Sequence, residues 1–269
     1  MGSGRDSRLV EWPEAAEHGA AVAITRRYGG VSEGPYESLN LGLHVGDDAQ
    51  RVLANRERAA EAFRVELGAM VFAEQVHGAA ATEVGAADRG RGTRRTDDAV
   101  PATDILVTTA LDTTLAIQVA DCVPLALLDP EARVLSAVHA GWRGTAAQVC
   151  ARALQAMRAL GARPERVLAY IGPGVDGARY QVDDAVYQAV EDAVAPYGLA
   201  PGVASPDGPG HWRLDLMAAN RQQLLLAGVR AAHISDCGVT TADDAFFSDR
   251  ALRPCGRFAL LARLTDGTP

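Results

Sequence analysis

The stretch LAIQVADCVPLALLDPEARVLSAVHAGWRGT, residues 115–145, holds two long apolar runs separated by the turn sequence DPEA at 129–132. Runs rich in Val, Leu and Ala and bounded by turn residues are typical of buried β-strands. The sequence therefore predicts a β-hairpin with two apolar faces, which belongs in an inner layer of the fold. Cys122 and His139 stand out because each interrupts one of these runs with a reactive side chain.

The expected turn also sets the register of the hairpin. If DPEA joins Leu128 to Arg133, Cys122 and His139 lie equally far from the turn and face each other across the strands. Their Cβ atoms would then be about 4.5–5.5 Å apart. That separation suits two ligands of one metal ion, or a thiolate and its imidazole partner. Pro124 cannot donate to the ladder, so its nitrogen has to face an edge or a bulge.

Caps and periodicity predict helices over 48–64, from Thr145 to about 160, over 183–195 and over 215–228. Strands are expected at 21–30, 70–77, 104–109, 166–172, 231–236 and 257–263, and a loop at 198–211. Strands and helices mix without regular βαβ alternation, which favours an α+β fold over a doubly wound sheet. We expect one catalytic domain over 20–269, preceded by a loosely ordered lead-in at 1–19.

Composition excludes several classes of protein. The net charge of -8 argues against a general nucleic-acid binder, and the one dense basic run, RGRGTRR at 89–95, is expected to be a mobile loop. No apolar run is long enough to span a membrane, and the first residues lack the apolar core of a signal peptide, so we expect a cytoplasmic protein. The chain has no lysine, which removes Schiff-base chemistry. Its four widely spaced cysteines fit neither a zinc knuckle nor a disulfide framework.

A third residue extends the Cys122 and His139 pair. His77 ends the apolar segment MVFAEQVH at 70–77. One thiolate and two imidazoles form a ligand set that favours zinc in a tetrahedral site with one open position. Water at such a position has a pKa of about 7. The alternative is that Cys122 is a small buried hydrophobic residue and each histidine a satisfied core residue.

The turn GWRGT offers a second functional feature. Arg143 just precedes the helix expected to begin at Thr145, where free N–H groups and a guanidinium would bind a phosphate or carboxylate. Trp142 could stack on a base or close the core, and Gln75 is expected to join the substrate-binding residues. Asp121 is the candidate proton carrier beside the thiolate, although a structural hydrogen bond would explain it equally well.

Several motifs together resemble one known family. They are SLNLGLHVGDD (38–48), EQVHG (74–78), ATDILVTT (102–109), VADCVP (119–124), VHAGWRGT (138–145), IGPGVDGARYQV (171–182), DLMAANRQQLLLAGV (215–229) and FFSDR with CGR (246–250 and 255–257). The chain resembles the bacterial and animal proteins known as multicopper polyphenol oxidoreductase laccases. These proteins are described as zinc-dependent purine nucleoside phosphorylases and, in bacteria, as a peptidoglycan editing factor.

The resemblance implies a zinc ion held by His77, Cys122 and His139, and phosphorolysis of adenosine, inosine, guanosine and methylthioadenosine, with deamination of adenosine. It implies a single α+β domain of stacked mixed β-sheets flanked by helices, similar to toxins with a cysteine and histidine hydrolase site. It also places Asn40 and His44 at the pocket. The sequence departs from the family pattern at Asp249, where an aromatic residue or histidine commonly follows the serine of FFS.

Three alternatives remain open at this point. One is an amidase that removes L-serine from the nucleotide-linked muramic acid precursor UDP-MurNAc-L-Ser, with Cys122 as nucleophile or zinc ligand. Another is a copper-dependent phenol oxidase, which fits poorly because six scattered histidines are too few ligands for a multicopper site. Copper bound by the same three residues stays possible. The last is a binding module without enzymatic activity.

Overall fold

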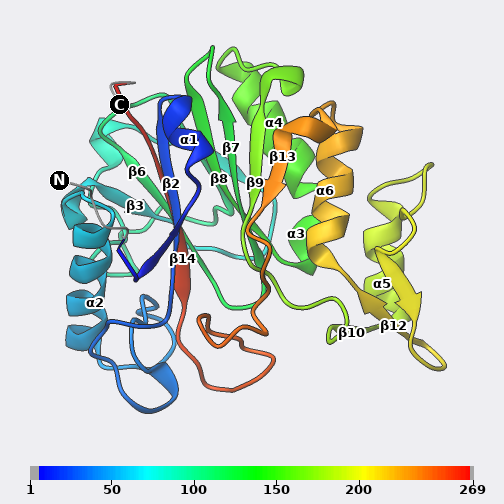
Figure 1. Cartoon of the computed structure of the whole chain (residues 1–269), viewed down its shortest axis with the longest axis horizontal. Helices are drawn as coiled ribbons and strands as arrows, with labels where there is room; N and C mark the ends of the chain where they lie inside the picture. Colours follow the sequence, from blue (N-terminus) through cyan, green and yellow to red (C-terminus); the bar gives the residue numbers. More distant parts are fainter. Residues whose placement is uncertain (1–5, 267–269) are drawn as a thin grey trace.

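The computed structural model describes residues 6–266 and contains two β-sheets stacked face to face between helices (Figure 1). The five-stranded sheet has the order β1-β2-β14-β6-β3, formed by Leu9–Glu11, Ala20–Thr25, Phe258–Leu264, Thr114–Val119 and Met70–Phe72. The six-stranded sheet has the order β13-β9-β7-β8-β5-β4, formed by Ile234–Asp236, Leu168–Ile171, Val123–Asp129, Val134–Ala140, Ile105–Thr108 and Ala81–Glu83. A small third sheet, β10-β12-β11, is formed by Gln181–Asp183, His211–Leu214 and Ala204–Pro206.

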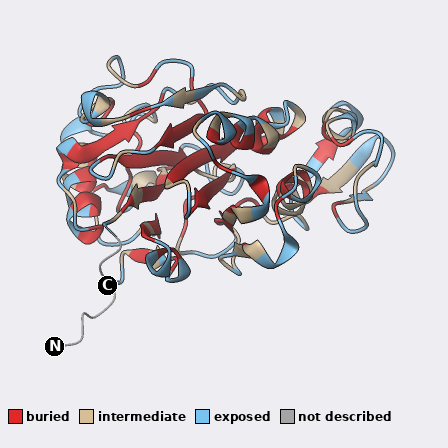
Figure 2. Ribbon diagram, turned by 90° about the horizontal axis from the view of Figure 1, so that it is seen from above, coloured by how far each residue is buried: buried red, intermediate tan, exposed pale blue. Residues whose placement is uncertain are grey.

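Apolar clusters hold these layers together. Side chains from both large sheets, such as Ile117 and Leu135, fill the space between them. The outer face of the six-stranded sheet packs against α4 (Val149–Ala159) and α6 (Leu216–Leu226), and that of the five-stranded sheet packs against α2 (Ala49–Ala62). Figure 2 shows the buried strands as the interior of the molecule. Because both sheets combine parallel and antiparallel pairs, the predicted α+β fold of stacked mixed sheets flanked by helices is confirmed.

The central hairpin forms, but its turn lies one residue further along the chain than expected. Asp129 belongs to β7 and pairs with Val134, so the loop is 130–133 and not 129–132. The Asp129 side chain explains the shift, because it accepts hydrogen bonds from two backbone N–H groups inside the turn. A local carboxylate thus decides where the strand ends.

The expected direct pairing of Cys122 with His139 is therefore wrong. Pro124 pairs with His139, and Cys122 lies just before β7, beside Gly141. The register differs by two residues, and side chains alternate across a strand with a period of two. Cys122 and His139 consequently keep the common face that the sequence predicted. The Pro124 nitrogen faces β9 at the end of the β7–β9 ladder, because the His139 N–H donates to the β5 side.

The apolar run before the turn is two strands rather than one. β6 lies in the five-stranded sheet and β7 in the six-stranded sheet, so the chain crosses between sheets at Asp121, which has a φ of 88°. A second crossing, between β3 and β4, contains His77 with a φ of 61°. Since β3 runs parallel to β6, both crossings leave the five-stranded sheet at the same end. The segment 70–77, expected as one strand, is in its second half part of this crossing.

The helix expected to begin at Thr145 starts earlier and is interrupted. α3 spans Trp142–Ala146 with Gly141 at its N-cap, and α4 follows after Gln148, which has a φ of 60°. The Thr145 hydroxyl donates to the Gly141 carbonyl and caps no helix N-terminus. The other expected helices correspond to α2, α5 (Asp184–Asp192) and α6, whose N-caps are aspartates.

Three segments contain more structure than the sequence suggested. Within the expected lead-in, β1 pairs with β2, and Trp12, which precedes α1 (Glu14–Glu17), stacks on Tyr170 with ring centroids 5.2 Å apart, whereas residues 1–5 lie outside the described part of the chain. The expected loop 198–211 contains β11. The basic run 89–95 is fixed by Arg56, which donates to two of its backbone carbonyls.

Within residues 6–266, no helix has the length and apolar character that crossing a membrane requires.

Candidate metal centre and active site

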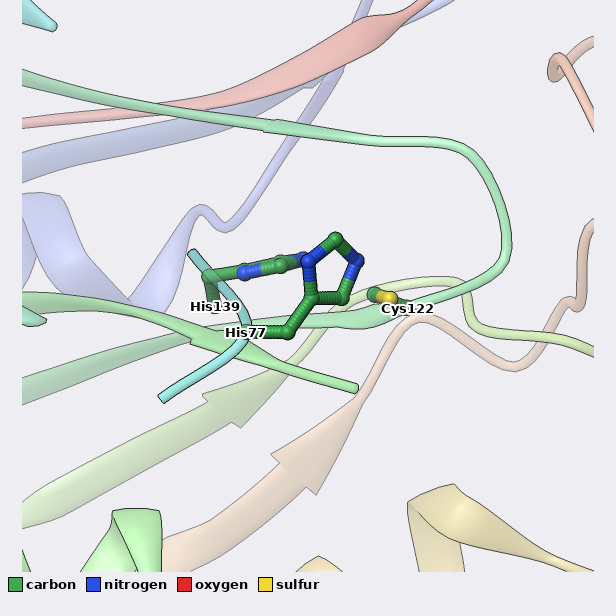
Figure 3. Close-up of side chains that lie close together, drawn as sticks. All are labelled: His77, Cys122 and His139. Carbon is green, nitrogen blue, oxygen red and sulfur yellow. The ribbon is translucent and has the colours of Figure 1, made fainter. Parts of the chain in front are cut away.

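His77, Cys122 and His139 meet where the two crossings leave the five-stranded sheet (Figure 3). One ligand atom from each residue can be chosen so that all lie within 4.8 Å of one another. The two imidazole rings are 4.8 Å apart between centroids and nearly perpendicular, with an angle of 71°. The three side chains that the sequence singled out therefore come together in space, and this set of donors could hold a metal ion.

Space for such an ion depends on Gly141. A Cβ atom at this position would lie 2.8 Å from the Cys122 sulfur and 3.2 Å from Cδ2 of His77. His139 is buried, at 3% exposure, whereas Cys122 is half-buried and His77 is exposed. The trio is therefore closed on the side of the sheets and open toward solvent.

Asp104, directly before β5, forms hydrogen bonds with two of the three residues, His77 and His139. Its Oδ1 is 2.7 Å from Nδ1 of His139 and accepts the backbone N–H of His77 at 3.0 Å. Its Oδ2 accepts the backbone N–H of Gly78 at 2.7 Å. Burial would raise the pKa of this carboxyl, but the bonds from His139 and the two N–H groups lower it overall. Asp104 is fully buried and was missed as a site residue, although it stands in the quoted motif ATDILVTT.

The thiol and the imidazole titrate as a coupled pair. Burial would raise the pKa of Cys122, yet the neighbouring His139 and His77 lower it to about 6. Burial would lower the pKa of His139, and the Cys122 thiolate together with Asp104 raises it. Without a metal, the geometry thus favours a thiolate beside an imidazolium at neutral pH. A thiolate is the form of cysteine that binds a metal or attacks a carbonyl.

The trio lies in the wall of a cavity of about 940 Å³, a size that accommodates a small ligand. Residues from several distant segments line it. Among them are His44, Phe72, Gln75, Trp142, Tyr180 and Asp249, and the arginines Arg56, Arg250, Arg253 and Arg257. Arginines, aromatic rings and several carboxylates thus line the cavity around the ligand set.

Arg56 is the most unusual of these arginines. It is 2% exposed, its Nε and Nη1 donate only to backbone carbonyls, and no carboxylate among the described residues forms an ion pair with it. Its guanidinium lies over the ring of Phe72 at 4.1 Å. Burial lowers the pKa of Arg56 to about 9, which still leaves it charged at neutral pH. The nearby Asp98 carboxylate opposes this shift in part but forms no ion pair with Arg56. A buried cation in a cavity wall is a natural partner for an anionic ligand.

His44 lies beside these cations in the cavity wall. Burial and the neighbouring Arg257, Arg56 and His77 lower its pKa, so the imidazole is neutral at pH 7. Gln75 also lines the cavity, but both ends of its amide bond the backbone of Gln118. His44, Gln75 and Trp142 thus lie where the sequence placed the ligand, with the Gln75 amide already engaged.

Two other expected binding residues do not line the cavity. Asn40 is fully buried, and its side chain bonds Asp47, Gly42 and the backbone N–H of Arg257, so it fixes the segment behind the cavity. Arg143 is exposed, and its guanidinium stacks on Trp142 at 4.4 Å. Arg143 therefore lies in the first turn of α3, outside the cavity, and not before a helix that begins at Thr145.

Asp121 reaches the cavity wall, but its carboxylate is already engaged. It accepts hydrogen bonds from the Thr241 hydroxyl at 2.6 Å, the Ser248 hydroxyl at 2.7 Å and the Arg250 backbone N–H at 2.6 Å. These bonds hold the FFSDR segment against the crossing that ends in Cys122. They agree with the structural role weighed for Asp121 from the sequence.

The arginines of the cavity wall were not anticipated. Arg250 and Arg257 stand in the quoted motifs FFSDR and CGR, which were noted without a role, while Arg56 lies on a helix with no motif around it. Asp249, where the sequence departs from the family pattern, bonds Arg253 at 2.7 Å and Arg257 at 3.4 Å. It therefore partly neutralises two cations at the mouth and leaves Arg56 as the inner one.

Comparisons with known proteins agree with this architecture. The profile of the family described as multi-copper polyphenol oxidoreductase laccase matches residues 21–265. The chain is 39% identical over 235 residues to purine nucleoside phosphorylase YlmD of Geobacillus stearothermophilus, covering 86% of this chain and 85% of that protein. It is 40% identical over 253 residues to purine nucleoside phosphorylase ORF3 of Streptomyces griseus, covering 93% and 97%. The crystal structure of YlmD from Geobacillus stearothermophilus matches with a TM-score of 0.92 at 37% identity, covering 98% of each chain.

Proposed function

The chain belongs to the multi-copper polyphenol oxidoreductase laccase family, and from that premise we propose that it is a zinc-dependent purine nucleoside phosphorylase. The proposed substrates are adenosine, inosine, guanosine and methylthioadenosine with inorganic phosphate. The same site would deaminate adenosine. Relatives named purine nucleoside phosphorylase support an enzyme of this kind.

One observation carries the proposal: the Cys and His trio and the buried Arg56, which has no ion-pair partner among the described residues, line the same cavity. A phosphorolytic enzyme has to bind a phosphate anion next to a neutral nucleoside. Arg56 and Arg257 provide two guanidinium groups, and the neutral His44 beside them can donate a hydrogen bond. Phosphate bound there would be adjacent to the trio, since His77 is close enough to His44 to influence its pKa.

The residues of the trio fit a catalytic zinc site, in which three nitrogen, sulfur or oxygen ligands leave a fourth position open. Gly141 leaves room beside the sulfur. Bound zinc would act as a Lewis acid toward the purine or its leaving group. Among residues 6–266 this is the sole cluster of three or more potential ligands, which is too few for a multicopper centre.

The protein's own residues have separate tasks in this proposal. Trp142 and Tyr180 flank the nucleoside with apolar surface, and Arg56 with Arg257 orients the phosphate toward the anomeric carbon. Asp121 holds the FFSDR segment so that Arg250 covers the mouth. Cleavage of the glycosidic bond then joins the ribose to phosphate and leaves the free base.

Product analysis tests this function. Zinc-loaded protein with inosine should release hypoxanthine and ribose 1-phosphate only when phosphate is present, and with adenosine it should give adenine and inosine. Cys122→Ser should abolish both reactions. Cys150→Ser is the matched control, because Cys150 is buried beneath the six-stranded sheet and lines no part of the cavity. No release of base by zinc-loaded wild type would refute the phosphorylase.

A second candidate is the amidase acting on UDP-MurNAc-L-Ser. The arrangement that favours it is Cys122 beside His139, with His139 held by Asp104, which is the order of nucleophile, base and orienting carboxylate. Release of serine from that precursor, measured beside nucleoside turnover, separates the two activities. Elemental analysis of protein purified without added metal separates zinc from copper.

A further inference from the structure

The Asp104 carboxylate joins two of the three metal ligands through one set of hydrogen bonds. It is fully buried, and every hydrogen bond that its side chain accepts comes from His139 or from the segment Val76–Gly78. We propose that Asp104 is a positioning residue that sets the backbone of His77 and the tautomer of His139 at the same time. This inference rests on the metal centre of the proposed function.

The first effect concerns the backbone of His77. This residue has a φ of 61°, a left-handed conformation that is unfavourable for a residue other than glycine. The N–H groups of His77 and Gly78 point at Oδ1 and Oδ2 of Asp104, at 3.0 and 2.7 Å. Hydrogen bonds to an ionised carboxylate are roughly twice as strong as neutral ones, so they offset this cost. This backbone conformation turns the His77 ring toward Cys122 and His139.

The second effect concerns the ring of His139. An ionised carboxylate only accepts hydrogen bonds, so at 2.7 Å from Oδ1 the Nδ1 atom of His139 has to carry a proton. Nε2 is then the atom with a free lone pair for a metal ion. Carboxylates that hold histidine ligands in this way are worth about 10–100-fold in metal affinity.

Asp104→Asn tests whether Asp104 acts through the hydrogen bonds of its carboxylate or only through the space that its side chain fills. If the new amide group takes the place of Oδ2, it faces the Gly78 N–H with another donor. If it takes the place of Oδ1, it faces the His77 N–H and donates to His139 Nδ1, which selects the tautomer whose Nε2 bears a proton and cannot bind a metal. In either orientation of the new amide group, the variant therefore loses a hydrogen bond that positions one of the two histidine ligands. The side chain nevertheless keeps its shape.

Asp129→Asn is the matched control. Asp129 is likewise a fully buried aspartate of the six-stranded sheet that accepts backbone N–H groups, but it lies at the far end of β7 and lines no part of the cavity. Both variants should lose stability. Only Asp104→Asn should lose metal affinity, which a purely structural role would leave unchanged.

The experiment measures zinc affinity by competition with a chromophoric chelator and records the visible absorption of the cobalt-substituted proteins. We expect Asp104→Asn to bind zinc about 10–100-fold more weakly, with altered cobalt bands, and Asp129→Asn to match wild type in both. Zinc affinity and cobalt bands of Asp104→Asn equal to wild type would overturn the inference.

Wild type itself decides the question if Asp104→Asn does not fold. Long-range ¹H–¹⁵N spectra of the zinc-loaded protein should show His139 with a proton on Nδ1, and ligation through Nδ1 would overturn the inference. A wild-type protein that binds no zinc would instead refute the metal-dependent function. In that protein, a neutral His139 protonated on Nε2 would still show that Asp104 does not orient the ring.

Discussion

Gly141→Ala tests whether the space beside Cys122 exists to hold a metal ion. Gly141 has φ -78° and ψ 174°, which any residue can adopt, so alanine introduces no backbone strain. Its only effect is steric. The new Cβ would lie 2.8 Å from the Cys122 sulfur, and an ordinary contact begins near 3.4 Å, so the sulfur has to move by about 0.6 Å.

That shift is large for a metal site. Ligand distances in such sites hold within about 0.2 Å, and the added methyl also presses on the His77 ring at 3.2 Å. We expect zinc affinity to fall at least tenfold, and the overpacking to cost about 1–3 kcal/mol of stability in the metal-free protein. No ligand atom is removed, so the loss would come from geometry alone.

Chelator competition and urea unfolding of the metal-free protein measure the two effects. Gly68→Ala is the control, because a Cβ atom at Gly68 meets no atom within 4 Å. It should leave both zinc affinity and activity unchanged. Gly141→Ala with wild-type zinc affinity and wild-type cobalt bands would refute the assignment of this space to a metal.

Three further experiments test other features of the protein. In steady-state kinetics, Arg56→Met should raise the KM for phosphate by about 10–100-fold while the zinc content stays unchanged. Arg58→Met, on the exposed side of the same helix, should leave the KM for phosphate unchanged. The rate at which iodoacetamide alkylates Cys122 in the metal-free protein should rise with pH and be half-maximal near pH 6, because the pKa of this thiol is lowered to about 6. A midpoint near pH 8.5, the pKa of an ordinary thiol, would show that Cys122 is not a thiolate at neutral pH. The pKa of Asp129 is lowered in the folded protein despite its burial, by hydrogen bonds from backbone N–H groups and Arg166, so its ionised form stabilises the fold. Asp129→Asn should therefore cost about 1–3 kcal/mol at pH 7, and urea unfolding should show the difference shrinking as pH falls below about 4 and through the lowered pKa.

Sequence patterns predicted those helices and strands that are determined by residues close together in the chain. The N-caps Asp48, Asp183 and Asp215 begin their helices where expected, because a capping carboxylate acts on N–H groups two or three residues away. The common face of Cys122 and His139 also followed from sequence, since alternation along a strand survives a slip of two residues. Their exact pairing did not follow, because the Asp129 side chain moved the turn.

The division of one apolar run into two strands could not be read from the sequence. β6 and β7 are each buried on both faces, so nothing in their composition shows that they belong to different sheets. The burial and the roles of Arg56 and Asp104 could not be predicted from their neighbours in the sequence either. Each is a charged residue whose burial is tolerated only because segments far away in the chain supply its partners, as Gly92 does for Arg56 and His139 for Asp104.

The crossings explain why the site lies where it does. A chain that leaves a sheet frees backbone N–H groups from the ladder, and buried groups of this kind need other partners. Asp104 accepts those of the crossing that contains His77, and Asp121, at the other crossing, binds the FFSDR segment. Asp104 thus both satisfies the crossing that contains His77 and orients a ligand, whereas Asp121 holds a wall of the cavity. Because the two carboxylates share no hydrogen-bond partner, we expect changes at Asp104 and at Asp121 to affect metal geometry and the covering of the mouth independently.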